Sequence, residues 1–150
     1  MYRSLEQGFE TNAFRVAVSQ QFFSRCLSKK RRLCYIFLGL LESLGLASKE
    51  LVIIAINDNM NAEKSGGTHW ALLVWYSKSG SFYYFDSLLD HNEAAARQTA
   101  HAMSASLGAT IPIKFKNVNV TQQNNNYDCG IHLLAIAHQV GTNFTNDAVF

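Results

Sequence analysis

Cys129 lies where a polar, asparagine-rich loop gives way to an apolar stretch that we expect to be a helix. Residues 124–130 read Asn-Asn-Asn-Tyr-Asp-Cys-Gly, and the apolar run from Ile131 to Val140 follows directly. A thiol at a helix N-terminus faces unpaired backbone N–H groups and the positive end of the helix dipole, and both favour the thiolate. Free cysteine is also a common small core residue. A reactive role for Cys129 therefore requires a base and an oxyanion site elsewhere in the chain.

His69 and Asp86 are the residues that best supply a base and a group to orient it. His69 opens the apolar stretch 69–76 after a glycine-bearing loop, and Asp86 closes the stretch 81–86. The residues between them, Ser-Lys-Ser-Gly at 77–80, are typical of a hairpin turn. In a hairpin, the start of the first strand and the end of the second lie at the same end of the sheet. We therefore expect the Asp86 carboxylate to lie on the far nitrogen of the His69 imidazole.

Gln123 precedes Cys129 by six residues, close enough to offer a side-chain N–H to a developing oxyanion beside the Cys129 backbone N–H. These four residues fit a cysteine nucleophile (Cys129), a general base and acid (His69), an orienting carboxylate (Asp86) and an oxyanion donor (Gln123). Singly, Asp86 could simply end a strand and Gln123 could be ordinary loop polarity. Their joint placement at element ends favours the catalytic interpretation.

The rest of the chain predicts the elements that must position this site. Apolar periodicity predicts helices over residues 14–26 and 33–46, and a continuous β-branched run predicts a buried strand over 51–56. An alanine-rich stretch predicts a helix over 92–107, and alternation predicts a strand over 111–120 with one wet face. This order predicts an α+β domain with one sheet and helices packed on it. We expect a loose leader at 1–13, the domain at 14–141 and a tail at 142–150.

Composition limits the class of protein. The chain has 150 residues, 48% hydrophobic and 16% charged, which is typical of one globular domain, and a net charge of +2 gives no reason to expect nucleic acid. Its three cysteines are an odd number and lack the spacing of a disulfide framework, which favours a reducing compartment. The first residues lack a signal-peptide pattern, and the longest apolar run, 33–41, is far shorter than the roughly 20 residues that cross a bilayer. We expect a soluble protein of the cytoplasm or nucleus with no membrane partner.

Neither a metal nor a cofactor is expected. His132 and His138 are six residues apart on the last predicted helix and so do not share a face as metal ligands would. Cys129 and His132 have suitable spacing, but two ligands do not make a zinc site. His91 is expected to face solvent near the alanine-rich helix.

Three motifs together resemble the Ulp/sentrin-specific cysteine proteases (peptidase family C48), which process and remove ubiquitin-like proteins. They are Gly-Gly-Thr-His-Trp at 66–70, Tyr-Tyr-Phe-Asp-Ser at 83–87 and Gln-x5-Cys-Gly at 123–130. The resemblance covers residues 50–140 firmly and 14–50 loosely. It implies a papain-like, Ulp-type protease domain with a mixed sheet packed by helices and the nucleophile at a helix N-terminus. It also implies a catalytic triad of His69, Asp86 and Cys129, with Gln123 at the oxyanion hole.

Within the family, the likeness is greatest to the NEDD8-directed branch, the deneddylases. The pointer is Ala-Ile-Asn-Asp-Asn at 55–59 leading through a long loop into Gly-Gly-Thr-His-Trp. The resemblance implies cleavage after the C-terminal Gly-Gly of a ubiquitin-like modifier, most of all NEDD8, and by analogy cullin-type conjugates as substrates. The alternatives are a SUMO-specific protease and an inactive relative that only binds modifiers. We expect a monomer.

The resemblance also assigns substrate-binding residues. Trp70 is expected to help form a narrow tunnel that admits only a Gly-Gly tail, because a tunnel that excludes side chains selects glycine sterically. By analogy, Asn57, Asn59 and Thr68 are expected along the modifier-binding surface.

The sequence departs from the family pattern at both ends. The Trp-Leu-Asn-Asp-like motif that usually supplies the other wall of the tunnel is missing, and residues 1–11 contain no tryptophan. Family domains also continue with further helical sequence after the catalytic helix. The sequence therefore looks like a version shortened at both ends with its catalytic centre intact.

Overall fold

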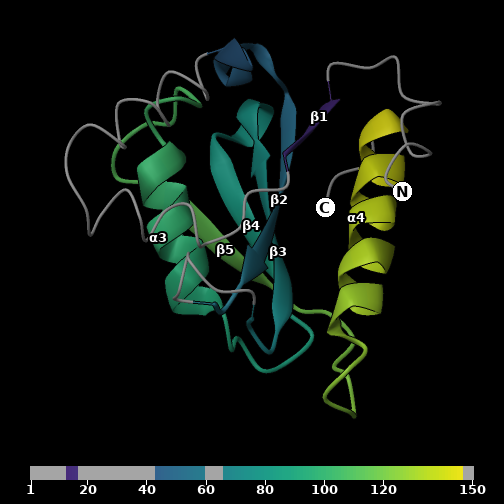
Figure 1. Cartoon of the computed structure of the whole chain (residues 1–150). Helices are drawn as coiled ribbons and strands as arrows, with labels where there is room; N and C mark the ends of the chain where they lie inside the picture. Colours follow the sequence, from purple (N-terminus) through teal and green to yellow (C-terminus); the bar gives the residue numbers. More distant parts are fainter. Residues whose placement is uncertain (1–12, 17–42, 60–65, 147–150) are drawn as a thin grey trace.

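A mixed five-stranded sheet organises the computed structural model, which describes residues 13–16, 43–59 and 66–146 (Figure 1). The sheet order is β1-β2-β3-β4-β5, with strands β1 (Ala13–Val16), β2 (Leu51–Asn57), β3 (Trp70–Tyr76), β4 (Ser81–Phe85) and β5 (Lys114–Val118). Strands β2, β3 and β4 are antiparallel, and β1 and β5 are parallel to their neighbours. Helix α3 (Glu93–Met103) covers one face and helix α4 (Cys129–Thr145) the other. The predicted α+β class is confirmed.

The hydrophobic core is divided between the two faces of the sheet, because successive side chains along each central strand point to opposite sides. On the α3 face, alternate residues of β2 and β3 pack with the alanines of the helix: Val52, Ile54, Ile56, Leu73, Trp75, Ala96 and Ala100. On the α4 face, the intervening strand residues pack against the apolar side of that helix, and the cluster comprises Leu51, Leu72 and Val74 from the strands and Leu133, Ile136 and Val140 from α4. The continuous apolar strands in the sequence are thus explained by burial on both faces.

The β3–β4 hairpin is the part of the fold that positions the candidate site. Its register pairs Leu72 with Phe85 and Tyr76 with Ser81, and the short 3₁₀ helix η2 (Ser77–Ser79) closes the turn. Gly80 completes the turn with a left-handed φ of 58°, which glycine adopts without strain. The predicted hairpin is confirmed, so the residue before β3 and the residue after β4 lie at one end of the sheet.

The helix predicted over residues 14–26 is wrong at its start, because residues 14–16 belong to strand β1. This strand pairs in parallel with β2, from Ala13 opposite Leu51 to Val16 opposite Ile54. The partner is more than 30 residues away in the sequence, so local periodicity could not reveal it. Residues 17–26, and the helix predicted over 33–46 as far as residue 42, lie outside the described residues.

Other element boundaries differ by a few residues. Helix α4 continues past Gly141 to Thr145, because Phe144 packs edge-on against Tyr76 with ring centroids 6.2 Å apart and so keeps the last turn on the sheet. Strand β5 is shorter than predicted and begins at Lys114. Within the described residues, no helix is long and apolar enough to cross a membrane.

Candidate active site

His69 and Asp86 form a buried pair at one end of the sheet. His69 directly precedes β3 and Asp86 directly follows β4. The imidazole Nε2 lies 2.5 Å from a carboxylate oxygen of Asp86, and the two side chains are 1% and 0% exposed. The geometry predicted from hairpin pairing is therefore the one observed, with the carboxylate on one ring nitrogen and the other left for a second partner.

Hydrogen bonds from three further residues converge on the Asp86 carboxylate. The Tyr84 hydroxyl donates to one oxygen, and the backbone N–H groups of Leu88 and Asn92 donate at 2.9 Å and 3.1 Å. Burial alone would raise the pKa of Asp86, but the hydrogen bonds from Tyr84, Asn92, His69 and Leu88 outweigh it and hold the pKa below its usual range. Asp86 is therefore an ionised carboxylate at neutral pH, able to hold an imidazole with Nε2 as the donor.

The backbone around His69 is fixed by Asn57 and Asp58, at the end of β2. Asp58 accepts hydrogen bonds from the backbone N–H groups of Thr68 and His69, at 2.6 Å and 3.1 Å, and from the Thr68 hydroxyl. Partial burial raises the pKa of Asp58, and these hydrogen bonds lower it further than burial raises it, so the carboxyl is ionised. The Asn57 amide donates to the His69 carbonyl oxygen at 3.2 Å. The peptide groups on both sides of His69 are thus held in place.

The residues expected to bind the modifier differ in their exposure. Trp70 is 39% exposed at the start of β3, and Thr68 is also exposed. Asn57 and Asn59 are buried, and the Asn57 side-chain oxygen accepts a hydrogen bond from the Asn59 backbone N–H at 2.9 Å. Direct contact of these asparagines with a modifier would require their side chains to leave these surroundings. Here they shape the loop that carries His69.

Gly67 is the point where this loop passes closest to Asn57. It has a φ of +96°, and a Cβ added to it would lie 2.0 Å from the Asn57 side-chain oxygen. We expect Gly67→Ala to lower the free energy of unfolding by about 3 kcal/mol, from strain and steric overlap together. Gly80→Ala is the matched control, since Gly80 also has a positive φ but open space around it, and should cost only about 1 kcal/mol. Chemical denaturation of both variants checks this, and equal losses would contradict it.

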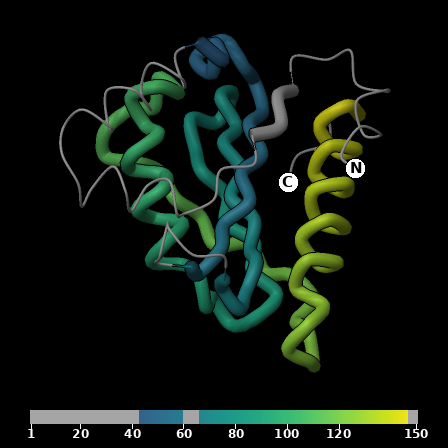
Figure 2. Tube along the Cα trace, viewed as in Figure 1, coloured from purple at the N-terminus to yellow at the C-terminus, as the bar shows by residue number. Residues whose placement is uncertain are grey.

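The segment before Cys129 is anchored to the residues that follow Asp86. The Gln123 backbone N–H donates to the Ser87 carbonyl, and the Ser87 hydroxyl donates to the Gln123 side-chain oxygen, both at 2.8 Å. The Gln122 amide donates to the Asp86 carbonyl at 3.0 Å and accepts from the Leu89 N–H at 2.8 Å. These contacts lead the chain from β5 around the end of the sheet to the start of α4 (Figure 2). Gln123 is therefore attached to the same turn as Asp86.

An asparagine-centred turn delivers the chain to Cys129. The Asn125 side-chain oxygen accepts the backbone N–H groups of Tyr127 and Asp128, at 3.1 Å and 3.0 Å, and its amide donates to the Asp128 carboxylate at 2.7 Å. The Gln123 amide donates to the Asn125 carbonyl at 2.6 Å. An amide NH₂ carries two protons, so this bond leaves one Gln123 proton for another acceptor. Asn125 is thus the residue of the asparagine-rich loop that builds this turn.

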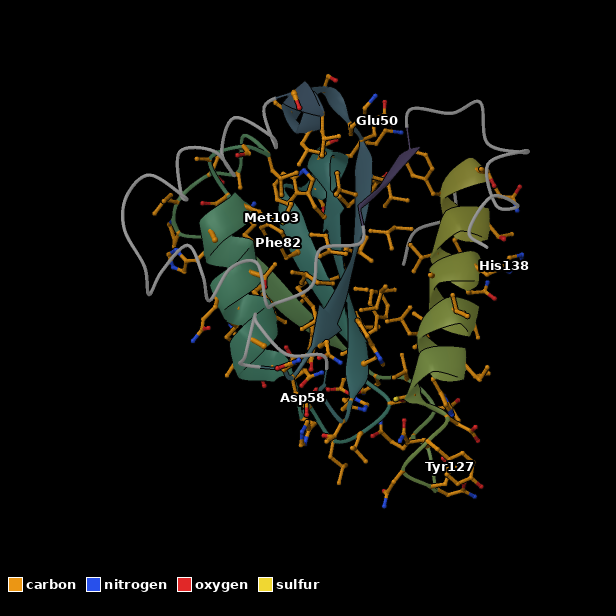
Figure 3. The ribbon with its side chains drawn as sticks, in the orientation of Figure 1. Glu50, Asp58, Phe82, Met103, Tyr127 and His138 are labelled. Atoms are coloured by element: carbon orange, nitrogen blue, oxygen red, sulfur yellow. The ribbon has the colours of Figure 1, made fainter. Side chains whose placement is uncertain are left out.

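Cys129 is the first residue of α4 and is 6% exposed. Figure 3 places Asp58, which holds the His69 backbone, and Tyr127, two residues before Cys129, at the same end of the sheet. The imidazole Nδ1 of His69 is buried and has no hydrogen-bond partner among the described residues. The thiol and imidazole therefore share one end of the molecule without a hydrogen bond between them. Such bonds often form only when substrate binds.

The described residues contain no group of three or more His, Cys, Asp or Glu side chains that could hold a metal ion. The groups at this end of the sheet include a thiol, an imidazole, a carboxylate and an amide.

Comparison with models of protein families identifies the family of the chain. The family model for the Ulp1 protease family, C-terminal catalytic domain, matches residues 1–148. The chain belongs to the Ulp1 protease family. The expected family membership is confirmed.

Curated proteins match part of the chain. Human sentrin-specific protease 8 is 38% identical over 105 residues, which is 69% of this chain and 49% of that protein. NEDD8-specific protease 1 of Arabidopsis thaliana is 37% identical over 101 residues, which is 67% of this chain and 45% of that protein. The chain thus spans about half the length of the curated relatives it matches.

Solved structures of the Ulp1 family share the fold. The SUMO protease Ulp1 with its catalytic cysteine oxidised to a sulfinic acid matches with a TM-score of 0.61 at 19% identity, covering 90% of this chain and 59% of that one. The Ulp1 protease domain in complex with Smt3, the yeast orthologue of SUMO, matches with the same TM-score and identity. At this identity the likeness concerns the fold alone.

Sequence reasoning missed several residues that support the site in this Ulp1-family domain. Tyr84 could have been found, because it lies two residues before Asp86 and therefore on the same face of the strand. The roles of Asp58 and Asn92 depend on how the loops fold, and no pattern in the neighbouring sequence predicts them. His91 is exposed, as expected, yet its ring lies edge-on to His69 at 5.5 Å and its Nε2 lies 3.6 Å from the Asp58 carboxylate.

Proposed function

We propose that this domain is a thiol peptidase that cleaves after the C-terminal Gly-Gly of a ubiquitin-like modifier, with NEDD8 as the preferred modifier. It would process precursors and release the modifier from conjugates, including cullin-type proteins. The proposed setting is the cytoplasm or nucleus, and the proposed active form is a monomer.

The observation that carries the proposal is the buried His69–Asp86 pair. Its carboxylate is ionised, its Nε2 is occupied, and its Nδ1 is unpartnered within the described residues. A base held in this way at the end of the sheet that also carries the start of the Cys129 helix matches the arrangement that a thiol nucleophile needs. Membership of the Ulp1 family supports the same assignment.

The reaction would follow from these positions. The Cys129 thiol gives its proton to His69 Nδ1, and the thiolate attacks the carbonyl carbon of the terminal glycine. Backbone N–H groups at the start of α4 and the Gln123 amide would stabilise the oxyanion. The imidazolium then protonates the leaving amine as the C–N bond breaks and a thioester forms. Water, deprotonated by His69, hydrolyses the thioester and frees the modifier and Cys129.

The choice of NEDD8 over SUMO rests on the sequence relatives. The relatives at 37–38% identity are named for sentrin-specific and NEDD8-specific proteases. A C-terminal fluorogenic amide of NEDD8, with the SUMO amide beside it, tests the choice. We expect hydrolysis of the NEDD8 amide and little of the SUMO amide. Faster SUMO hydrolysis would identify a SUMO protease, and NEDD8 binding without hydrolysis of either would identify a modifier-binding relative.

Gln123 has a more specific predicted role. We expect Gln123→Ala to lower kcat by about 10²–10³-fold with little change in modifier binding, because an oxyanion donor acts mainly in the transition state. Steady-state kinetics and calorimetric binding separate the two effects. Gln139→Ala, which removes an exposed amide on α4, is the matched control. An equal loss of binding and kcat in Gln123→Ala would count against the oxyanion role.

A further inference from the structure

Asn92 contacts both members of the His69–Asp86 pair. Its side chain is buried, with the residue 2% exposed, and its amide donates to the His69 carbonyl oxygen at 3.1 Å. Its backbone N–H donates to the Asp86 carboxylate at 3.1 Å. One residue outside the reacting groups therefore connects the loop before β3 to the turn after β4.

The contact with His69 is part of a double clamp. The same carbonyl oxygen accepts the Asn57 amide at 3.2 Å, so both of its lone pairs are used. Asn57 comes from the end of β2, and Asn92 from the start of α3. The two amides fix the His69 peptide group from two different elements, which restricts the positions that the attached imidazole can take.

The Asn92 side chain does not perform its usual local task. Asparagine at the N-cap of a helix normally accepts a hydrogen bond from its own first turn through its side-chain oxygen. Asn92 is the N-cap residue of α3, and its side chain makes no such bond within the described chain. The amide is directed at His69 instead, so its contribution is to the site more than to the helix.

The backbone of Asn92 acts on Asp86 in a complementary way. The Asn92 N–H that donates to the carboxylate lies at the start of α3, where the positive end of the helix dipole also stabilises a negative charge. A change confined to the Asn92 side chain leaves this N–H in place. The two halves of the contact can therefore be separated by mutation.

We propose that Asn92 is a positioning residue that holds the His69 imidazole in register with the Asp86 carboxylate through its paired contacts to both. This rests on the proposed function, in which His69 serves the Cys129 thiol, but Asn92 itself does not touch the reacting atoms.

Asn92→Ser tests the proposal, because serine keeps the backbone N–H and N-cap capacity and removes the amide on the His69 carbonyl. One readout is the rate of iodoacetamide alkylation of Cys129 between pH 5 and 9, measured on its peptide by mass spectrometry with Cys26 and Cys34 as internal references. The other is the solvent exchange rate of the His69 Nε2 proton, measured by NMR. Neither readout needs a modifier. We expect Cys129 alkylation near pH 7 to slow, and Nε2 proton exchange to accelerate, each by about 10-fold.

Glu93→Ala is the matched control, since it removes an ion pair with Arg97 at the same end of α3 without touching His69 or Asp86. It should lower Tm slightly and leave both rates at their wild-type values. Wild-type rates in Asn92→Ser, or the same changes in Asn92→Ser and Glu93→Ala, would overturn the proposal. Faster proton exchange in Asn92→Ser would support it even if wild-type Cys129 were no more reactive than the other cysteines and cleaved no modifier. A wild-type Cys129 that is no more reactive than the other cysteines and cleaves no modifier would reject the proposed function and leave the role of Asn92 standing.

Discussion

Replacing Cys129 with alanine is expected to abolish hydrolysis of a NEDD8 C-terminal amide, with a fall in kcat of about 10⁵–10⁶-fold. The loss is this large because the base, the carboxylate and the oxyanion donors have no other nucleophile to serve within the proposed site. Modifier affinity should remain, since the thiol contributes little surface to a bound tail. Steady-state hydrolysis and calorimetric binding provide the two measurements.

Cys26→Ala and Cys34→Ala are the matched controls, because each removes one thiol by the same chemical change. Both should retain wild-type turnover. Hydrolysis that persists in Cys129→Ala, or that disappears in either control alone, would contradict the assignment of Cys129 as the nucleophile.

Changing Asp86 to asparagine is expected to lower kcat by about 10⁴-fold while KM stays close to its wild-type value. The ionised carboxylate accepts the Nε2 proton of His69, so that Nδ1 is the basic nitrogen, and it stabilises the imidazolium that forms. A neutral amide can present an N–H in its place and favour the other tautomer. It also provides no negative charge.

Asp90→Asn is the matched control, because Asp90 lies exposed in the turn after Asp86 with a φ of 58°, a conformation that asparagine also tolerates. It should leave kcat unchanged. Thermal denaturation of both variants separates catalysis from folding. A rise in KM with unchanged kcat in Asp86→Asn would show that the pair serves binding or structure instead.

The His69–Asp86 contact could be predicted from the sequence because it depends on one hairpin. Two apolar stretches joined by a short glycine-bearing turn specify antiparallel pairing, and that pairing alone brings residues 69 and 86 together. The start of α4 could likewise be located, since a polar loop changes abruptly into an apolar helix at Cys129.

The remaining support for the site depends on contacts that local sequence does not encode. Leu89 and Asp90 both take left-handed φ values, 45° and 58°, and this turn returns the chain so that the Asn92 N–H meets Asp86. Non-glycine residues rarely adopt this conformation, so the residue types at positions 89 and 90 do not predict this turn. The helix prediction for residues 14–16 was wrong for a related reason, because strand β1 forms by pairing with β2, a distant part of the chain. The periodicity of apolar residues identifies the buried face of a helix or strand, whereas this turn and strand β1 depend on contacts with residues elsewhere in the chain.

The most direct measurement uses NEDD8 that carries a thiol-reactive electrophile in place of its C-terminal carboxylate. Incubation with the chain, followed by intact-mass analysis and peptide mapping, should reveal one added modifier, attached at Cys129 and absent from Cys129→Ala. The equivalent SUMO reagent should react much more slowly. Absence of an adduct with either reagent, or an adduct confined to Cys26 or Cys34, would contradict a Gly-Gly-directed thiol peptidase centred on Cys129, His69 and Asp86.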